Sequence, residues 1–369
     1  MVAALLAGLV SLPGLARLLP SDASSSLSAA QLLELVRAGD RVAWSGYAEV
    51  RGDLDLPDVR ELSALPATIG EITRLRTWWR GPQEWRADSM TLTGELDVVQ
   101  GRTRDGRAPR RITWDSEERN ADLVIGEQTV RLPVGADLLP NALGARLARA
   151  DGIVPSLVAD RRVAGRPAVG LRLSAAERAT TTVEHVDVWV EPTTGLPLRV
   201  EVTAQGADRP SVTALVLDLD LAPPPVERTR FVLPPGATVT RDATPDLAAI
   251  ADREARLQLP AGLAGLPRDD RVEGLGGGVA TYGTGFTALT VVPLRPGTAS
   301  DGHRRLRRAQ PATVRPGATA AVGTPLAQVL LAVRGDRGYL LAGTVPESLL
   351  QTALAALEAD PPPPREGIR

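Results

Sequence analysis

The stretch from His185 to Val202, HVDVWVEPTTGLPLRVEV, decides the fold. Apolar residues stand at every second position in both of its halves, and charged residues occupy most of the positions between them. This two-residue period is typical of β-strands that bury one face. Pro192 and Gly195 lie between the halves, and glycine can adopt the positive φ that a hairpin loop requires. The stretch therefore predicts a β-hairpin with one large apolar face.

The composition narrows the possible functional classes. The chain has 369 residues, which is enough for two domains, and a net charge of −2 argues against nucleic acid as a partner. All 42 basic residues are arginine, a bias typical of GC-rich codon usage, so the arginines are not interpreted individually. The sequence contains no cysteine, which excludes thiol catalysis, disulfides and cysteine-ligated metals.

Residues 1–26 predict a signal peptide or an N-terminal anchor. Pro13 and Arg17 interrupt the apolar run of residues 1–20, and a full membrane span needs about 20 apolar residues. Small residues at Ser21-Asp22-Ala23 have the spacing of a signal-peptidase site. We therefore expect an extracytoplasmic protein, peripheral to the membrane; the alternative is a buried N-terminal helix.

The remaining sequence predicts two domains. Between residues 27 and 222, short alternating segments follow one another without crossover helices, which indicates an antiparallel sheet. Residues 223–258 predict a proline-rich linker with a bridging helix, and residues 259–360 a smaller domain of strands and helices. The proline-rich tail, residues 361–369, is expected to be disordered.

The sequence has few residues that could support catalysis. Its two histidines, His185 and His303, do not have metal-ligand spacing, and neither a serine-hydrolase elbow nor a phosphate-binding loop is present. Acidic residues fall on the predicted outer faces of strands and are expected to be solvated, although a glycosidase-like carboxylate pair stays open. We therefore predict a protein that is not an enzyme and needs no cofactor or metal.

Five segments in order resemble the RseB/MucB group of the LolA/LolB-like superfamily: WSGYAEV, RTWWRGPQEWRAD, GELDVVQ, ITWD and VDVWVEPTTGLPLRVEV. Two segments of the second half, VATYGTGFTALTVVPL and LLAGTVPESLLQTALAAL, resemble the small C-terminal domain of RseB-type proteins. The resemblance covers residues 40–360. It implies an α+β fold: a strongly curved antiparallel sheet, an unclosed half-barrel plugged by helices, plus a smaller C-terminal α+β domain.

The resemblance also implies a binding function. Proteins of this group bind the extracytoplasmic domain of a membrane anti-sigma factor and respond to envelope lipids, and the related carriers transport lipoproteins. An acyl lipid or lipoprotein, or an anti-sigma factor, is therefore the expected partner. The expected hydrophobic cavity is lined by Val42, Trp44, Ala48, Leu75, Trp79, Trp85, Leu139, Leu143, Val186, Val188, Val190, Leu198 and Val200, with Leu196 and Val202 on the same face. Helices near residues 58–69 and 135–148 are expected to cover this cavity.

Three functions remain in competition. The first is a regulator that binds an anti-sigma factor and senses envelope lipids, the second is a LolA/LolB-like lipid or lipoprotein carrier, and the third is an exported enzyme acting on envelope glycans. The assignment of faces makes a further prediction: Leu75→Glu or Val188→Glu should abolish lipid binding or unfold the domain, whereas Glu49→Ala should do neither.

Overall fold

The computed structural model describes residues 27–52, 72–90, 93–126, 134–241, 257–269, 279–306, 313–315 and 319–364. The larger domain contains the helices α3 (Ala29–Ala38) and α4 (Pro140–Ala148) and the short 3-10 helices η1 (Gly39–Arg41), η4 (Gly135–Leu138), η5 (Arg178–Thr180) and η6 (Val226–Thr229). Its strands are β1 (Trp44–Gly52), β2 (Ile72–Gly81), β3 (Glu84–Met90), β4 (Glu95–Arg102), β5 (Pro109–Asp115), β6 (Asn120–Ile125), β7 (Ile153–Val163), β8 (Arg166–Ala175), β9 (Val183–Val190), β10 (Pro197–Ala204), β11 (Val212–Asp220) and β12 (Thr238–Arg241).

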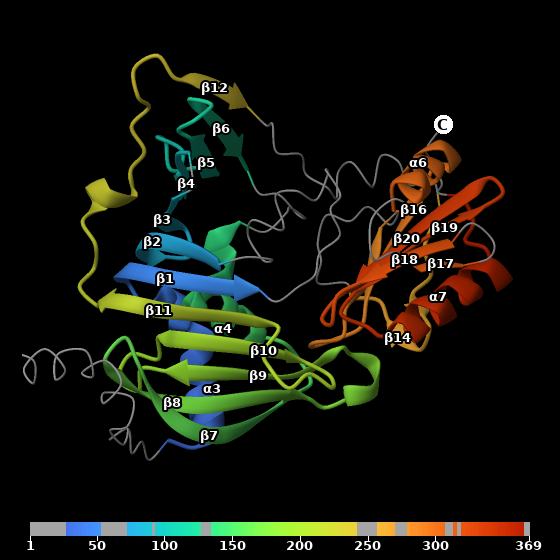
Figure 1. The fold of residues 1–369 in the computed structure, drawn as a ribbon, viewed down its shortest axis with the longest axis horizontal. Coiled ribbons are helices and arrows are strands. Elements are labelled where there is room, and N and C mark those ends of the chain that lie inside the picture. The colour runs from blue at the N-terminus through green and yellow to red at the C-terminus, as the bar shows by residue number, and fades with distance from the viewer. Residues whose placement is uncertain are drawn as a thin grey trace, which may run out of the picture.

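These strands form one 12-stranded sheet in the order β12-β6-β5-β4-β3-β2-β1-β11-β10-β9-β8-β7. The two edge strands, β12 and β7, lie at opposite ends of a curved and unclosed sheet (Figure 1). Every pairing in it is antiparallel except that of β12 with β6. The predicted α+β fold with a half-barrel sheet is therefore confirmed.

The strands β9 and β10 form the predicted hairpin. Val188 lies opposite Val200 and Val186 opposite Val202, so their side chains share the concave face. In the loop, the Glu191 carboxylate accepts hydrogen bonds from the backbone N–H (2.7 Å) and the hydroxyl (2.6 Å) of Thr194. Gly195 has φ = +76°, and a Cβ at this position would approach the Leu35 backbone oxygen to 3.0 Å. The glycine therefore allows both the turn and the close approach of α3.

Two helices cover one half of the concave face. Helix α3 begins with a capping box in which the Ser28 hydroxyl accepts a hydrogen bond from the Gln31 backbone and the Gln31 side chain accepts one from the Ser28 backbone. It buries Leu32, Leu33 and Val36. Helix α4 begins at Pro140, which suits the first helical turn, and packs against β10 and α3. In Figure 1 both helices lie behind the strands β7–β11.

The smaller domain contains a six-stranded sheet in the order β15-β16-β20-β19-β18-β17. Its elements are β15 (Ala280–Tyr282), β16 (Leu289–Leu294), α6 (Pro296–Leu306), β17 (Thr313–Arg315), β18 (Thr319–Gly323), β19 (Gln328–Arg334), β20 (Arg337–Gly343) and α7 (Glu347–Ala359), preceded by the two-residue strands β13 (Gly262–Leu263) and β14 (Leu266–Pro267). Leucines of β19, β20 and α7 form a separate hydrophobic core. None of the helices in the described ranges is long and apolar enough to cross a bilayer.

Residues of the turn before β9 join the two domains. The Thr181 hydroxyl donates to the Phe286 carbonyl (2.9 Å), and the Thr182 hydroxyl donates to the Leu326 carbonyl (2.6 Å). The Thr182 N–H also donates to the Thr344 carbonyl. The side chains of Phe286 and Leu326 belong to the core of the larger domain. The second domain is therefore packed against the first through hydrogen bonds and apolar contacts.

Two predicted boundaries are wrong. The segment after residue 222, predicted as a linker, crosses the outer face of the large sheet and then adds β12 to it through parallel pairing with β6. It stays on the sheet because Phe231 packs on Trp114, with ring centroids 6.0 Å apart. In the predicted disordered tail, Pro364 pairs with Leu257, and the Pro363 carbonyl accepts a hydrogen bond from Gln258.

Several predictions concern parts of the chain outside the described residues. These are the export segment (residues 1–26), the helix near residues 58–69, most of the bridging helix (residues 242–256) and the last residues of the tail (365–369).

Candidate functional site

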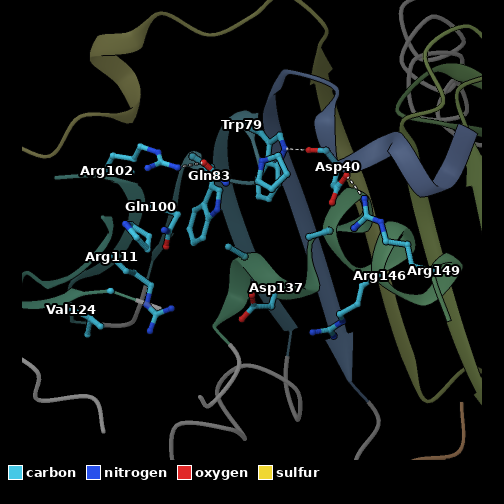
Figure 2. A pocket seen from close by; sticks show the side chains of 17 residues that line it. Asp40, Trp79, Gln83, Gln100, Arg102, Arg111, Val124, Asp137, Arg146 and Arg149 are labelled. Atoms are coloured by element: carbon cyan, nitrogen blue, oxygen red, sulfur yellow. Dashed lines mark hydrogen bonds and ion pairs between the residues drawn. The ribbon is translucent and has the colours of Figure 1, made fainter. Parts of the chain in front are cut away.

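The concave face of the large sheet has a covered half and an open half. The strands β7, β8, β10 and β11 pack against α3 or α4, whereas the concave side of β3–β6 borders a hollow of about 490 Å³. The 3-10 helix η4 and the helix α4 form the opposite wall of this hollow (Figure 2). Its volume lies within the usual range of sites for small ligands, about 300–1,000 Å³.

Two stacked tryptophans form the apolar part of the hollow. Trp79 on β2 and Trp85 on β3 lie directly opposite each other across the hairpin, with ring centroids 5.8 Å apart and planes inclined by 6°. The indole N–H of Trp79 donates a hydrogen bond to the backbone oxygen of Asp40 (2.6 Å), which fixes the orientation of the ring. The two rings are 3% and 4% exposed, so an apolar chain entering the hollow would meet only a small, rigidly held part of each ring.

The rim of the hollow is mainly cationic. Among the described residues, its lining includes four arginines (Arg102, Arg111, Arg146 and Arg149) and two carboxylates (Asp40 and Asp137). Both carboxylates already have partners, because Asp40 pairs with Arg149 (2.6 Å) and Asp137 accepts a hydrogen bond from the Val134 N–H (2.7 Å). Arg111 reaches the hollow from β5 and Arg146 from α4, so the positive charge stands on both walls (Figure 2).

The hollow thus combines an apolar floor with an anion-attracting rim. Glutamines (Gln83 and Gln100) and small residues (Ala136 and Ala142) complete the lining. The lining contains no serine, threonine, cysteine or histidine among the described residues. The arrangement can hold an amphipathic molecule, apolar at one end and anionic at the other, through burial and charge.

The structure distributes the predicted cavity residues unequally. Trp79 and Trp85 line the hollow. Both tryptophans also belong to the packed core of the larger domain, together with the other predicted residues, of which Val42 is partly buried and the rest are buried: Trp44, Ala48, Leu75, Leu139, Leu143, Val186, Val188, Val190, Leu198 and Val200. In this structure the helices α3 and α4 occupy the concave side above these residues. As a lining for a ligand, they stay a prediction.

The polar residues of the site were missed at the level of sequence. The excess of arginine over lysine is typical of GC-rich codon usage and singles out no individual arginine. In the structure, four arginines line the hollow. One signal was available: Arg146 and Arg149 are spaced i, i+3, which places them on one side of the predicted helix. Asp40 and Arg111 carry no such signal, because only the curvature of the sheet brings their elements together.

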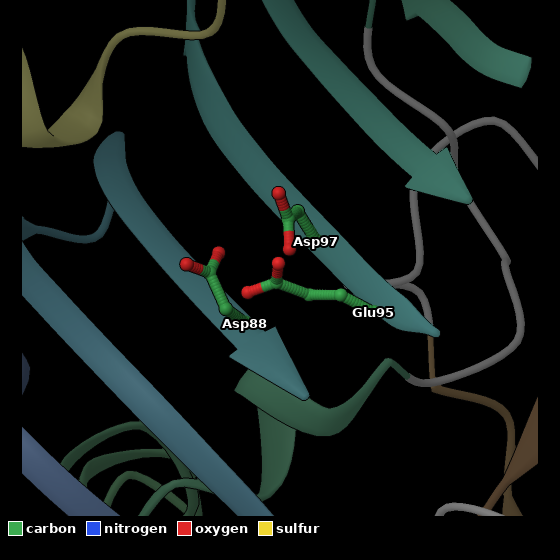
Figure 3. A group of neighbouring side chains, drawn as sticks. All are labelled: Asp88, Glu95 and Asp97. Atoms are coloured by element: carbon green, nitrogen blue, oxygen red, sulfur yellow. The ribbon is translucent and has the colours of Figure 1, made fainter. Parts of the chain in front are cut away.

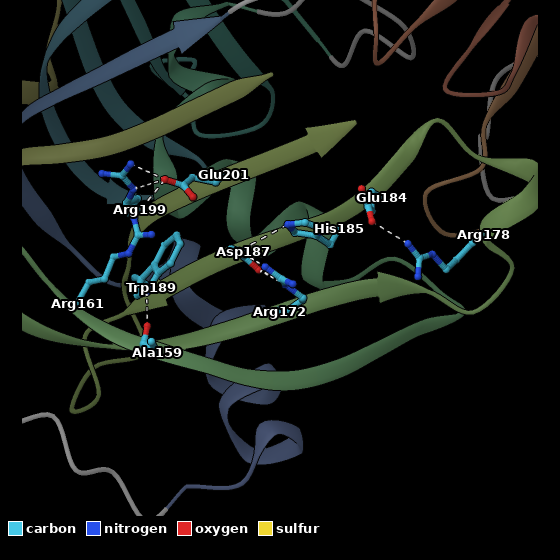
Figure 4. Close-up of polar contacts among 10 residues, drawn as sticks. All are labelled: Ala159, Arg161, Arg172, Arg178, Glu184, His185, Asp187, Trp189, Arg199 and Glu201. Carbon is cyan, nitrogen blue, oxygen red and sulfur yellow. Dashed lines mark hydrogen bonds and ion pairs between the residues drawn. The ribbon is translucent and has the colours of Figure 1, made fainter. Parts of the chain in front are cut away.

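The outer face of the sheet contradicts the prediction of solvated carboxylates. Asp187, Glu201 and Glu49 are buried, because arginines on the same strand or on other strands of the sheet lie over them. Arg172 forms two hydrogen bonds with Asp187, both 2.7 Å, and Arg199 pairs with Glu201 (Figure 4). Arginine can cover a carboxylate in this way because its planar guanidinium donates two parallel hydrogen bonds and its stem is apolar.

Aromatic rings continue this outer layer. The guanidinium carbon of Arg161 lies 4.1 Å from the ring centroid of Trp189, and the indole N–H donates to the Ala159 carbonyl (3.0 Å; Figure 4). His185 lies 3.7 Å from Asp187, and burial together with the nearby Arg172 lowers the pKa of His185. We interpret these contacts as structural, because the carboxylates are paired with arginines and the Trp189 ring is covered by Arg161.

A second group of carboxylates lies on the outer face of β3 and β4. Asp88 and Asp97 are directly opposite across the strands, and Glu95 completes a group whose oxygens lie within 4.8 Å of one another (Figure 3). Arg86 bridges the pair, at 2.6 Å from Asp88 and 2.8 Å from Asp97. Burial, reinforced by the charge of Asp88, raises the pKa of Asp97 to about 7. Arg86 therefore already supplies the cation that this group requires.

Comparisons with known proteins name the group that the sequence resembles. No family profile and no curated protein match this chain. Among solved structures, it is similar to MucB in complex with MucA(peri) (16% identity, 88% of this chain and 96% of that one, TM-score 0.48) and to the Pseudomonas aeruginosa MucA/MucB complex (17%, 89% and 96%, 0.47). A LolA superfamily protein from Nitrosomonas europaea is also similar (14%, 56% and 99%, 0.25). At this level of similarity, the function has to be inferred from the residues of this chain.

Proposed function

We propose that this chain is an extracytoplasmic binding protein resembling RseB/MucB, which regulates a sigma-factor stress response. In this role it would bind the extracytoplasmic domain of a membrane anti-sigma factor and respond to an envelope lipid. The observation that carries the proposal is the open half of the concave face, where a hollow lined by four arginines reaches down to the stacked and largely buried rings of Trp79 and Trp85. Both expected occupants, an acidic amphipathic peptide segment and an anionic lipid, have the chemistry that this surface fits.

The energetics favour an occupant with an apolar part. Each methylene group buried against the tryptophan pair would contribute about 0.8 kcal/mol, so a short acyl chain or a few aliphatic side chains suffice for binding. The arginines would select an anionic end group, because a charge-assisted hydrogen bond is roughly twice as strong as a neutral one. No covalent chemistry is needed for this function.

The second domain supports a regulator over a simple carrier. It is held in place by the hydrogen bonds of Thr181 and Thr182 and by the insertion of Phe286 into the core of the first domain. A fixed second domain next to the half-barrel offers an additional surface for a protein partner. The alternative, a LolA/LolB-like lipid or lipoprotein carrier, is favoured by the tryptophan floor alone, since a carrier needs only an apolar site.

Native mass spectrometry of the protein purified from its own host without detergent tests the proposal. We expect a bound lipid mass or a co-purified anti-sigma segment, lost when Arg111→Glu and Arg146→Glu are combined. Arg162→Glu is the matched control, because Arg162 is an exposed arginine on β7, far from the hollow in the sheet order. A protein that carries neither a lipid nor a protein segment would contradict the proposal.

The same preparations separate the two candidate functions. A regulator should retain its protein partner until an anionic lipid is added, and should then release it. A carrier should pass its lipid from donor to acceptor vesicles without any protein partner. Hydrolytic activity on envelope glycans that persists after removal of all bound lipid would instead favour the enzyme alternative.

A further inference from the structure

One end of the larger domain carries a concentration of positive charge. We define the distal tip as the loop between β4 and β5 (residues 103–108), the adjoining ends of β5 and β6, and residues 230–239. In Figure 1 the strands β6 and β12 mark this end, at the top of the view. Residues 102–111 contain five arginines (Arg102, Arg104, Arg107, Arg110 and Arg111) and one acidic residue, Asp105, which gives the segment a net charge of +4 (five minus one). The net charge of the whole chain is only −2, so the overall composition does not reveal this local excess of positive charge.

The outer side of the distal tip contains a groove of about 370 Å³. Two arginines, Arg104 and Arg110, border it, and the other lining residues are apolar: Ile112, Ala121, Leu123, Phe231, Val232, Leu233 and Val239. The Nε–H group of Arg110 is buried and has no hydrogen-bond acceptor within the described part of the chain. A guanidinium at the edge of an apolar groove is suited to pair with an anionic oxygen.

Large aliphatic side chains are exposed around this groove. Val232 is 83% exposed, and Ile125, Val239 and Leu233 are between 43% and 49% exposed. Ile125 lies opposite Arg110 in the pairing of β5 with β6, so charge and apolar surface are interleaved. Single exposed aliphatic residues are ordinary, but four around one arginine-lined groove form a patch that calls for an explanation.

We propose that the distal tip docks onto an anionic lipid bilayer. The exposed aliphatic side chains would enter the boundary between head groups and acyl chains, and the arginines would pair with lipid phosphates. Arg102 and Arg111 of the same segment line the concave hollow on the other face of the sheet, so docking would hold the hollow close to the membrane surface. The inference deepens the proposed function, because it states where the occupant of the hollow would come from.

A bilayer fits this patch better than an acidic protein does. The fully buried centre of a protein–protein interface is typically enriched in aromatic residues that fill pockets. Among the described residues that line the groove, Phe231 is the one aromatic side chain, and it is already packed on Trp114; the exposed side chains are separate aliphatic ones. Such side chains can insert independently into a lipid surface, and each nearby arginine then strengthens binding by about fivefold.

Site-specific fluorescence can test the docking directly, because the chain has no cysteine. We would introduce Val232→Cys at the tip and, as a matched control, Leu157→Cys on the edge strand β7, where Leu157 is 52% exposed. Each full-length variant would be labelled with a polarity-sensitive dye and mixed with vesicles of phosphatidylcholine, with or without phosphatidylglycerol. The N-terminal segment is common to both proteins and cannot produce a difference between them.

We expect a blue shift for the label at position 232 with phosphatidylglycerol vesicles only, decreasing with salt, and none at position 157. Combining Arg104→Glu with Arg110→Glu should weaken the titration by about thirtyfold or more, from two arginine contributions. No shift at position 232, an equal shift at position 157, an equal shift without phosphatidylglycerol, or a shift with acidic peptide but not with vesicles would overturn the inference. If the variant with both Arg104→Glu and Arg110→Glu loses vesicle binding but still carries the molecule bound in the hollow, membrane docking and binding in the hollow are separate properties that can be tested independently.

Discussion

The two halves of the large sheet share one strand pattern but differ in what covers them. In the half formed by β7–β11, the concave side chains of Val186, Val188 and Val200 are completely buried under α3 and α4. In the half formed by β3–β6, the equivalent face opens into the hollow and carries the polar residues Gln100 and Arg111 between Trp85 and Val124. The chain therefore places its stabilising core and its candidate binding surface side by side on one sheet.

This difference shows that alternation predicts a face but not its use. A strand with an apolar face needs only some partner that excludes water, and helices, ligands and other proteins all serve. Helices α3 and α4 reach β10 and β7 but leave β4–β6 uncovered, and the outer face of that open half is covered instead by the segment that carries Phe231.

The largest expected effect comes from placing the same charge in each half. Val188→Glu should destabilise the larger domain by about 4 kcal/mol or more, because the carboxylate would be buried among aliphatic side chains without a partner. Gln100→Glu should leave stability close to that of the wild type, because water and the arginines of the hollow can solvate the charge. Urea denaturation measures both. Equal loss of stability in the two variants would remove the distinction between a covered and an open half.

A second prediction concerns the buried carboxylates behind the open half. The pKa of Asp97 is raised to about 7, above its usual value of 3.8, so the unfolded chain loses this proton at lower pH than the folded protein does. Stability is thus lost as pH rises from about 4 to about 7, and Asp97→Asn should recover on the order of 2 kcal/mol at pH 8 and almost nothing at pH 4.

Urea denaturation at both pH values checks this prediction for Asp97. Asp208→Asn, an exposed aspartate in the turn between β10 and β11, is the control and should show no such change between the two pH values. A gain from Asp97→Asn that is the same at pH 4 and pH 8 would mean that the proton is not retained on folding.

The outer cover of the open half should depend on one aromatic contact. Phe231→Ala removes the ring that packs on Trp114 and should lower the free energy of local opening of β12 by about 1–2 kcal/mol. Hydrogen exchange at Thr238–Arg241 would measure it, with the adjacent and exposed Val232→Ala as the matched control. Unchanged exchange in the Phe231 variant would show that strand pairing alone holds this segment.

The smallest effect is expected for Glu49→Ala, which the sequence predicts to be neutral. Glu49 is buried and pairs with Arg51 and Arg74, but both arginines are more than half exposed, so we expect a loss of only about 1 kcal/mol. Burial raises the pKa of Glu49, yet the two arginines outweigh it and lower the pKa overall.

The pH dependence of the Glu49 variant follows from this sign. A lowered pKa contributes stability above the usual value of 4.5, and this contribution is lost as pH falls through the folded-state pKa. The deficit of Glu49→Ala should therefore be largest at neutral pH and shrink toward pH 3 in denaturation experiments. A deficit that grows on acidification would assign the effect to lost packing.

Much of the fold follows from local patterns. The hairpin of β9–β10, the capping box of Ser28 and Gln31, and the turn at Gly335 between β19 and β20 appear where the sequence predicts them. The segment after residue 222 was misjudged, because its prolines indicate a linker while its attachment depends on Phe231 meeting Trp114, more than a hundred residues away in the chain.

What the sequence by itself determined is the alternation of faces, the antiparallel hairpins and the scarcity of reactive side chains, since these depend on neighbouring residues and on composition. Only the tertiary structure decided which apolar face became core and which arginines met at the hollow. The reason is physical: side-chain direction is a local property of a strand, whereas the coverage of its face depends on helices and loops that reach it from distant parts of the chain. Arg111 and Val188 both point inward from their strands, yet Arg111 lines the hollow whereas Val188 is buried in the core, and this difference arises from the placement of α3 and α4.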